Sequence, residues 1–200
     1  MAVTSKGPPP NIQPQDLWDQ ITTMPRPYRI APFPRKNAKG EPIGEIAFVV
    51  LTDPGQRQLF WETTSGPDWR GESQSGPLTR APVVIVPLAN KHAYLERYAL
   101  PDKVHTPLSN EAHWPAPYWD IDTGFGVMMI LLTAVELGLG ALFFGIFAGE
   151  RALMDVLGVP EGFRPIGAIA VGHPTPGQRS RPELPTGRRR LDEVVRWERW

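Results

Sequence analysis

Residues 118–160, from Tyr118 to Pro160, read YWDIDTGFGVMMILLTAVELGLGALFFGIFAGERALMDVLGVP, and this stretch decides the fold. We interpret it as an apolar helix (Gly126 to Gly138), a short strand (Ala141 to Phe147) and an amphipathic helix (Glu150 to Leu157). The first helix is apolar almost all round, so it is predicted to be buried on every side, against the rest of the chain or against a partner subunit. At roughly 12 to 15 residues it is too short to cross a bilayer.

The segments around this stretch predict a mixture of strands and helices. The run APVVIVPL is apolar throughout, as in a central strand buried on both faces. Adding the strand at 141–147 gives four strands and four or five helices, which is typical of an α+β or α/β fold in three layers. The other predicted strands are Glu45–Leu51, Ala81–Leu88 and Ile166–Val171, and the other predicted helices are Gln15–Thr23, Pro54–Thr63 and Lys91–Tyr98.

Composition limits the classes of protein that fit. The 200 residues suit one domain, and the 21 basic and 21 acidic residues balance, so no overall field favours nucleic acid or a membrane surface. The absence of cysteine excludes disulfides and thiolate chemistry. No secretory signal precedes the domain, which makes a cytoplasmic location the expectation. Proline content predicts a flexible arm at residues 1–14, a domain at 15–187 and a tail at 188–200.

Few side chains form a pattern that indicates catalysis. The four histidines, His92, His105, His113 and His173, lack the spacing of metal ligands, so we expect no metal site. Asp120 and Asp122 are two residues apart at the start of the central helix. They could form a carboxylate pair, but acidic residues at a helix N-terminus complement its dipole, which is the favoured interpretation.

Two segments could bind a phosphorylated aromatic cofactor. Arg188, Arg189 and Arg190 follow a flexible connector and could hold a phosphate by charge-assisted hydrogen bonds, or they could form a solvated basic run. The strand ALFFGIF offers an apolar wall, and Gly145 would permit close approach of a flat ring. A core strand with a bulge at the glycine is the favoured interpretation of these seven residues on their own.

Taken together, five segments in order resemble the nitroreductase family of flavin enzymes, and most closely its branch of actinobacterial oxidoreductases. The resemblance runs from about Glu45 to Trp200. The matching segments are APVVIVPL (81–88), PYWDIDTG (117–124), LGLGALFFGI (137–146), PIGAIAVGHP (165–174) and RRRLDEVVRWERW (188–200).

The resemblance implies an α+β fold of three layers, α-β-α, with a four-stranded, mostly antiparallel sheet. It also implies a homodimer whose C-terminal tail crosses onto the partner subunit and often adds a strand there. FMN would lie at the dimer interface, with a backbone amide near Phe143, Phe144, Gly145 and Ile146 facing the flavin N5 region. A basic residue among Arg188–Arg190 would bind the phosphate, and NAD(P)H would reduce nitro, quinone, enone or flavin acceptors through FMN in a ping-pong reaction.

The sequence departs from the family pattern between Thr23 and Gly44. This segment is too short and too rich in proline for the helix that the family places there, although Arg26 and Arg29 could replace the family's N-terminal arginines. Two alternatives to the FMN enzyme therefore stay open. The first is a non-catalytic or weakly flavin-binding dimer that binds a small aromatic ligand, and the second is an enzyme that takes hydride from a deazaflavin.

Overall fold

The computed structural model describes residues 35–36, 42–43, 46–65, 76–174, 189, 191–197 and 199. The predicted arm at 1–14 and the predicted helix Gln15–Thr23 lie outside these residues. A short antiparallel pair, β1 (Arg35–Lys36) and β2 (Pro42–Ile43), precedes the main body of the molecule. All other elements described below belong to that body or to the C-terminal tail.

The centre of the molecule is an antiparallel sheet in the order β3-β4-β7-β5. Every residue of β4 is buried, as the continuous apolar run predicts. The strands are β3 (Ile46–Leu51), β4 (Val83–Asn90), β5 (Gly140–Phe144) and β7 (Ala168–Gly172).

A fifth strand, β6 (Phe163–Pro165), pairs with the last residues of β4. The expected antiparallel sheet is confirmed, but the strand count of four is wrong. Three residues are too few to show the alternation by which strands are recognised in a sequence.

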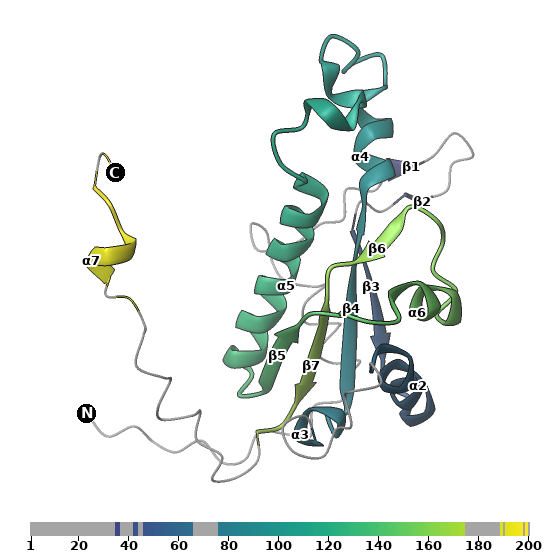
Figure 1. The fold of residues 1–200 in the computed structure, drawn as a ribbon, viewed down its shortest axis with the longest axis vertical. Coiled ribbons are helices and arrows are strands. Elements are labelled where there is room, and N and C mark those ends of the chain that lie inside the picture. The colour runs from purple at the N-terminus through teal and green to yellow at the C-terminus, as the bar shows by residue number, and fades with distance from the viewer. Residues whose placement is uncertain are drawn as a thin grey trace.

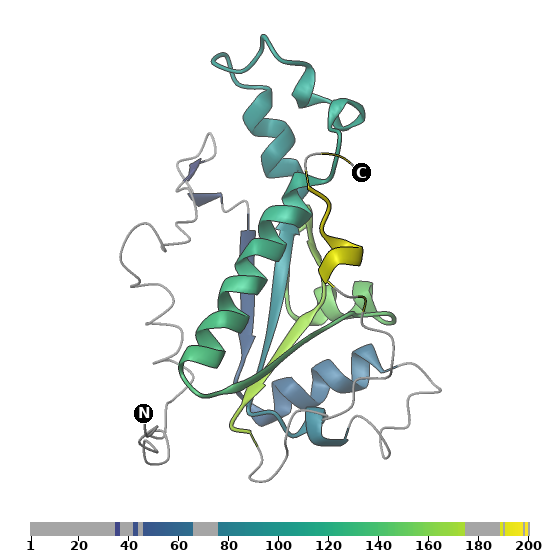
Figure 2. The same ribbon diagram turned by 90° about the vertical axis from the view of Figure 1, so that its left-hand side faces the viewer.

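Helices cover both faces of this sheet and make three layers (Figures 1 and 2). Helix α5 (Tyr118–Glu136) lies along one face, and α2 (Pro54–Thr64) and α6 (Glu150–Val156) lie along the other. Two apolar clusters fill the spaces between the layers. The α5 side contains Val83, Ile85, Val127, Ile130, Ile169 and Val171, and the α2–α6 side contains Leu51, Phe60, Val84, Val86, Leu153 and Ala168.

Helix α5 differs from the prediction in length and in burial. It begins at Tyr118, eight residues earlier than predicted, and its 19 residues and mean hydropathy of 1.2 would allow it to cross a membrane by those two criteria alone. One face packs on the sheet and includes the fully buried Ile130 and Ala134. The opposite face is exposed within this chain, so the chain alone does not bury the helix on every side, and burial against a partner subunit stays a prediction. We call the exposed row Phe125, Met128, Leu132 and Val135 the α5 stripe.

A small lobe extends beyond the end of the sheet where β4 ends (Figure 2). It consists of α4 (Lys91–Tyr98) and the 3-10 turns η1 (Pro107–Ser109) and η2 (Glu111–His113). Its core is aromatic: the Trp114 ring contacts the rings of Tyr94, Tyr98, Tyr118 and Trp119 at centroid distances between 5.0 and 5.9 Å. Segment 101–117, predicted as an irregular loop, therefore has its own packed centre.

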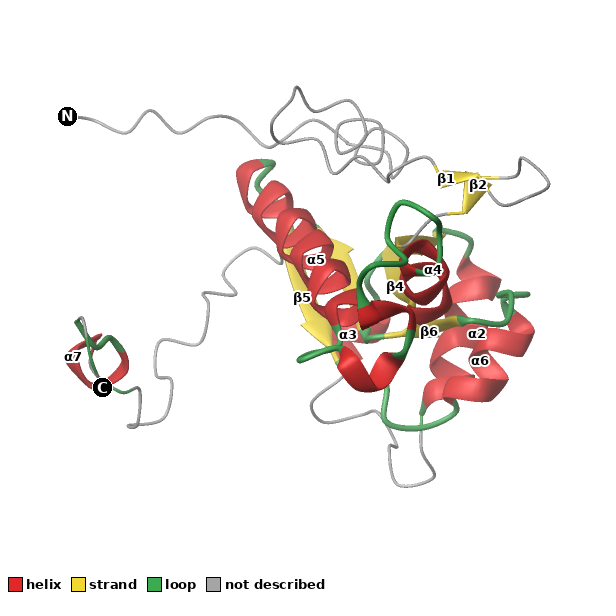
Figure 3. Ribbon diagram, turned by 90° about the horizontal axis from the view of Figure 1, so that it is seen from above, coloured by secondary structure: helices red, strands yellow, loops and turns green. Residues whose placement is uncertain are grey.

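Two further short helices lie at the borders of the described residues. Helix α3 (Gly76–Thr79) precedes β4, and α7 (Leu191–Val194) belongs to the C-terminal tail. In Figures 1 and 3 α7 lies apart from the three layers, off the side of the sheet where β5 is the edge strand. The tail's Trp197 side chain is 84% exposed, so this chain alone does not bury it.

Candidate functional site

The end of β5 brings together the four residues predicted to lie beside a flavin. Phe144 and Ile146 point to the α2–α6 side, where both pack against the apolar cluster. The Phe144 ring stacks on the Trp61 ring at a centroid distance of 5.4 Å and an interplanar angle of 13°. Because these two side chains belong to the core, only the backbone of Phe144 and Ile146 is available to a ligand.

Phe143 points to the opposite face of the sheet, because side chains alternate along a strand. Its ring lies over Gly167, the residue before β7: a Cβ built on Gly167 would lie 2.6 Å from the Phe143 ring and from the Phe144 carbonyl oxygen. Gly167 has φ +149°, a conformation that residues with a side chain rarely adopt. Phe143 is therefore a partly exposed aromatic wall fixed by its packing on bare backbone.

Gly145 leaves the sheet and is covered by a side chain that the sequence did not indicate. A Cβ built on Gly145 would lie 2.6 Å from Cζ of Phe147, so the Phe147 ring lies directly over the Gly145 backbone. The Phe147 side chain is 98% exposed, and no other part of the described chain holds it in place. The predicted strand to Phe147 ends at Phe144 for this reason: residues 145–149 turn away from the sheet edge toward α6 (Figure 1).

The predicted phosphate-binding arginines are mostly outside the described residues. Arg26, Arg29, Arg188 and Arg190 belong to that group, and Arg189 is described and exposed. The positions of these arginines relative to the end of β5 are therefore not described, and their role in phosphate binding stays a prediction.

The other candidate residues do not form a catalytic group. All four histidines are exposed, and the described residues contain no group of three or more His, Asp or Glu side chains placed to hold a metal ion. Asp120 and Asp122 do not form a carboxylate pair. Asp122 accepts a 2.5 Å hydrogen bond from the Tyr94 hydroxyl, and Asp120 accepts one from the Arg164 guanidinium.

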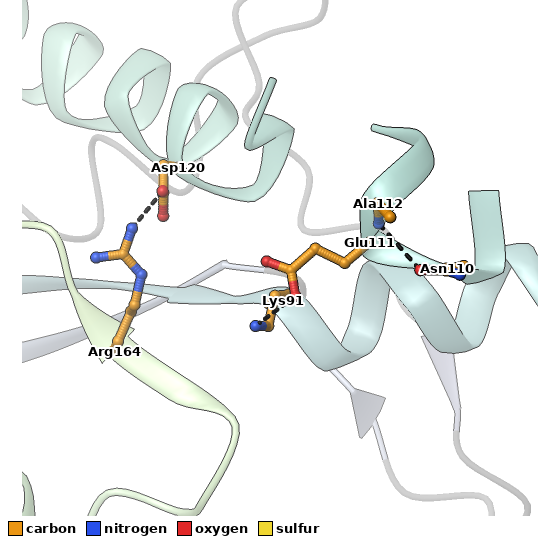
Figure 4. A network of polar contacts seen from close by, with 6 residues as sticks. All are labelled: Lys91, Asn110, Glu111, Ala112, Asp120 and Arg164. Atoms are coloured by element: carbon orange, nitrogen blue, oxygen red, sulfur yellow. Dashed lines mark hydrogen bonds and ion pairs between the residues drawn. The ribbon is translucent and has the colours of Figure 1, made fainter. Parts of the chain in front are cut away.

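A pocket of about 320 Å³ lies where the lobe meets the sheet, and sequence reasoning missed it. Two ion pairs border it, Lys91 with Glu111 at 2.9 Å and Arg164 with Asp120 (Figure 4). These four residues come from α4, η2, α5 and β6, and no local motif connects them.

Comparisons with known proteins agree with this fold. The model of the nitroreductase family matches residues 34–173. Similar solved structures include a Bacteroides fragilis protein (20% identity, TM-score 0.58, covering 94% of this chain and 67% of that one) and NfrA2 of B. megaterium (20%, 0.54, 78% and 58%). A third is the NADPH:FMN oxidoreductase of Vibrio harveyi in complex with NAD+ (19%, 0.52, 78% and 59%). The chain thus spans less than two-thirds of the length of the last two proteins. A search of curated protein sequences found no match.

Proposed function

This chain belongs to the nitroreductase family, and from that premise we propose that it is an FMN-dependent NAD(P)H oxidoreductase that works as a homodimer. The observation that carries the proposal is the end of β5. There, the backbone at Gly145, covered only by the solvent-exposed Phe147 ring, adjoins the exposed Phe143 ring, while Phe144 and Ile146 anchor the same segment in the core. An anchored backbone edge beside an apolar wall fits the isoalloxazine ring, which needs a flat contact and oriented amide donors.

Each part of the chain has a defined task in this proposal. When bound, FMN supplies hydride transfer between NAD(P)H and a nitro, quinone, enone or flavin acceptor. The backbone at Gly145 and Ile146 orients the ring, and Phe143 excludes water from one side of it. Arg26, Arg29 and the run Arg188–Arg190 bind the phosphate through charge-assisted hydrogen bonds.

We infer a second subunit because one chain leaves a row of apolar side chains exposed to water. The four side chains of the α5 stripe are each more than half exposed and follow one another at helical spacing along one face. The tail adds exposed Val194 and Trp197, and α7 lies apart from the three layers (Figure 3). We infer that two α5 stripes face each other across the dimer interface. We also infer that the tail of each chain, residues 188–200, packs on the domain of the partner subunit, residues 15–187.

The visible spectrum of the purified protein tests the proposed function. Flavin absorption near one FMN per chain, bleached by NADPH or NADH and restored by a quinone such as menadione, is the expected result. Colourless protein that FMN cannot reconstitute contradicts it. That outcome favours the alternative, a non-catalytic dimer that binds a small aromatic ligand, which titration with flavin-sized aromatic compounds would then detect. FMN that binds tightly but resists NADH and NADPH points instead to a deazaflavin as the hydride source.

A further inference from the structure

The pocket between the lobe and the sheet has walls from four segments that are far apart in the sequence. Its floor is apolar, made by Pro117, Trp119 and half-buried Phe163. Its rim is polar, made by Lys91, Glu111, Asp120 and Arg164 (Figure 4). The described residues that line it come from other segments than the residues proposed to contact flavin. At about 320 Å³ it has the volume of the smaller ligand pockets of proteins.

The hydrogen-bonding groups left over on this rim are mainly donors. Lys91 has three N–H groups and uses one toward Glu111, and Arg164 has five and uses one toward Asp120, as far as the described residues show. The acceptors left over are fewer. Oδ2 of Asp120 accepts from Arg164, and Oδ1 of Asp120 is buried without a hydrogen-bond partner among the described residues. A ligand that enters the pocket therefore meets unused donors of two cationic side chains.

The start of α5 adds to this preference. Pro117 caps the helix without a side-chain hydrogen bond, and its carbonyl oxygen accepts from the N–H groups of Asp120 and Ile121. The N-terminal end of a 19-residue helix attracts negative charge, although Asp120 already supplies part of that charge. His92, the second residue of α4, also lines the pocket and adds a third basic group.

We propose that this pocket binds a flat small molecule that carries one carboxylate or phosphate group. The anionic group is held by Arg164 and Lys91, and the flat part lies against Trp119 and Phe163. Such a ligand is either a free aromatic acid or a phosphate ester of a nucleoside. The proposal does not depend on flavin binding or on the redox activity proposed above.

Titration by NMR with two matched pairs of probes tests it: benzoate with benzamide, and adenosine 5′-monophosphate with adenosine. In each pair the shapes are similar and only the first member is anionic. At least one anion is expected to bind about tenfold more tightly than its neutral counterpart. Preference for benzoate identifies a free aromatic acid as the ligand class, and preference for the nucleotide identifies a phosphate ester.

Three variants test whether the preference for the anionic probe depends on the charged side chains of the rim. Arg164→Gln is expected to weaken the preferred anion about tenfold, and Arg151→Gln, which removes the exposed ion pair with Asp155 on the far side of the sheet, is expected to leave it unchanged. Glu111→Gln frees Lys91 and is expected to tighten binding about threefold. Because Glu111 is exposed, this variant tests the sign of the effect even if Arg164→Gln fails to fold. Equal binding of charged and neutral probes, or weaker binding by Glu111→Gln, overturns the proposal.

Discussion

Two glycines near the end of β5 distinguish a position where a ligand contacts the backbone from a position that is needed only for packing. Gly145 and Gly167 both lack room for a side chain, but the obstacle differs. At Gly167 the obstacle includes the Phe144 carbonyl oxygen, which is rigid backbone, and the conformation itself is strained for other residues. At Gly145 the obstacle is the end of the Phe147 ring, which is free to rotate into solvent.

Gly145→Val is therefore expected to fold. Rotation of Phe147 makes space for the new side chain, and we expect a melting temperature within about 4 °C of the unchanged protein, which corresponds to roughly 1 kcal/mol at this chain length. The valine would occupy the place where a flavin ring meets the backbone, so the dissociation constant for FMN should rise at least tenfold. Thermal melts read together with flavin fluorescence measure both effects. A folded Gly145→Val protein that binds FMN fully refutes this placement of the ring.

Gly167→Ala is the matched comparison, because Gly167 directly precedes β7, the strand that pairs with β5. It places a methyl group against the Phe144 carbonyl oxygen at a φ of +149°, so the free energy of unfolding should fall by at least about 2 kcal/mol. Denaturant unfolding measures this loss. Flavin binding should decrease only in proportion to the folded protein that remains. If Gly145→Val lowered the free energy of unfolding as much as Gly167→Ala does, both glycines would serve packing alone.

The arginine run at 188–190 should distinguish FMN from riboflavin, which lacks the phosphate. Changing Arg188, Arg189 and Arg190 together to Ala removes charge-assisted hydrogen bonds of about 1.5–3 kcal/mol each. Loss of even one raises the dissociation constant for FMN at least tenfold and leaves riboflavin almost unaffected. Flavin fluorescence titration gives both constants. Equal losses for the two flavins would show that the run is a solvated surface.

At the level of helices and strands, the sequence predicts the elements whose pattern is local. The central strand β4 appears where the continuous apolar run predicts it, shifted by two residues, and the helix α4 has its predicted bounds. The first two turns of α5 were not predicted as helix, because Asp120 and Asp122 were placed ahead of the apolar run as acids that complement its dipole. They become helical since Asp120 pairs with Arg164 and Asp122 with Tyr94, residues 44 and 28 positions away. Contacts over such separations leave no signal in a single sequence.

The same limit applies to the candidate sites. Phe143 to Ile146 could be proposed as a site from the sequence because they lie in one continuous segment that resembles a family, and their role stays a prediction. Phe147 could not, since nothing in its neighbours shows that its ring covers Gly145. The pocket between the lobe and the sheet was not predictable either, because it is assembled from α4, η2, α5 and β6.

The α5 stripe provides a test of the dimer at the scale of one helix. Replacing Leu132 and Val135 by Asp puts two charges into the proposed interface, and burying an unpaired charge is strongly unfavourable. We expect this variant to sediment as a monomer. The matched control replaces Leu100 and Val104, which are 48% and 71% exposed against 57% and 72% for Leu132 and Val135, but lie in the lobe. The control should remain dimeric. Dimers in both variants would place the interface elsewhere.

At the scale of the whole molecule, the tail should link stability to concentration. Deleting Leu191–Trp200 removes the exposed Val194 and Trp197, which we expect to be buried on a partner. The melting temperature should fall, and it should depend more strongly on protein concentration than that of the full chain. Calorimetry over a hundredfold range of concentration measures this dependence. A folded full-length monomer at micromolar concentration, seen by sedimentation, would contradict an obligate dimer.

Each chain completes both of its apolar clusters while the α5 stripe is still in water. In the proposed dimer the last step of folding is therefore an encounter between two nearly finished subunits. Refolding should show a final phase whose rate rises in proportion to chain concentration, after faster phases that do not. When chains are scarce, or when unrelated unfolded proteins are abundant, the stripe stays uncovered for longer and can attach to the wrong surface. Yield on expression should then depend on how soon a new chain meets a second copy of itself, as well as on how well it folds alone.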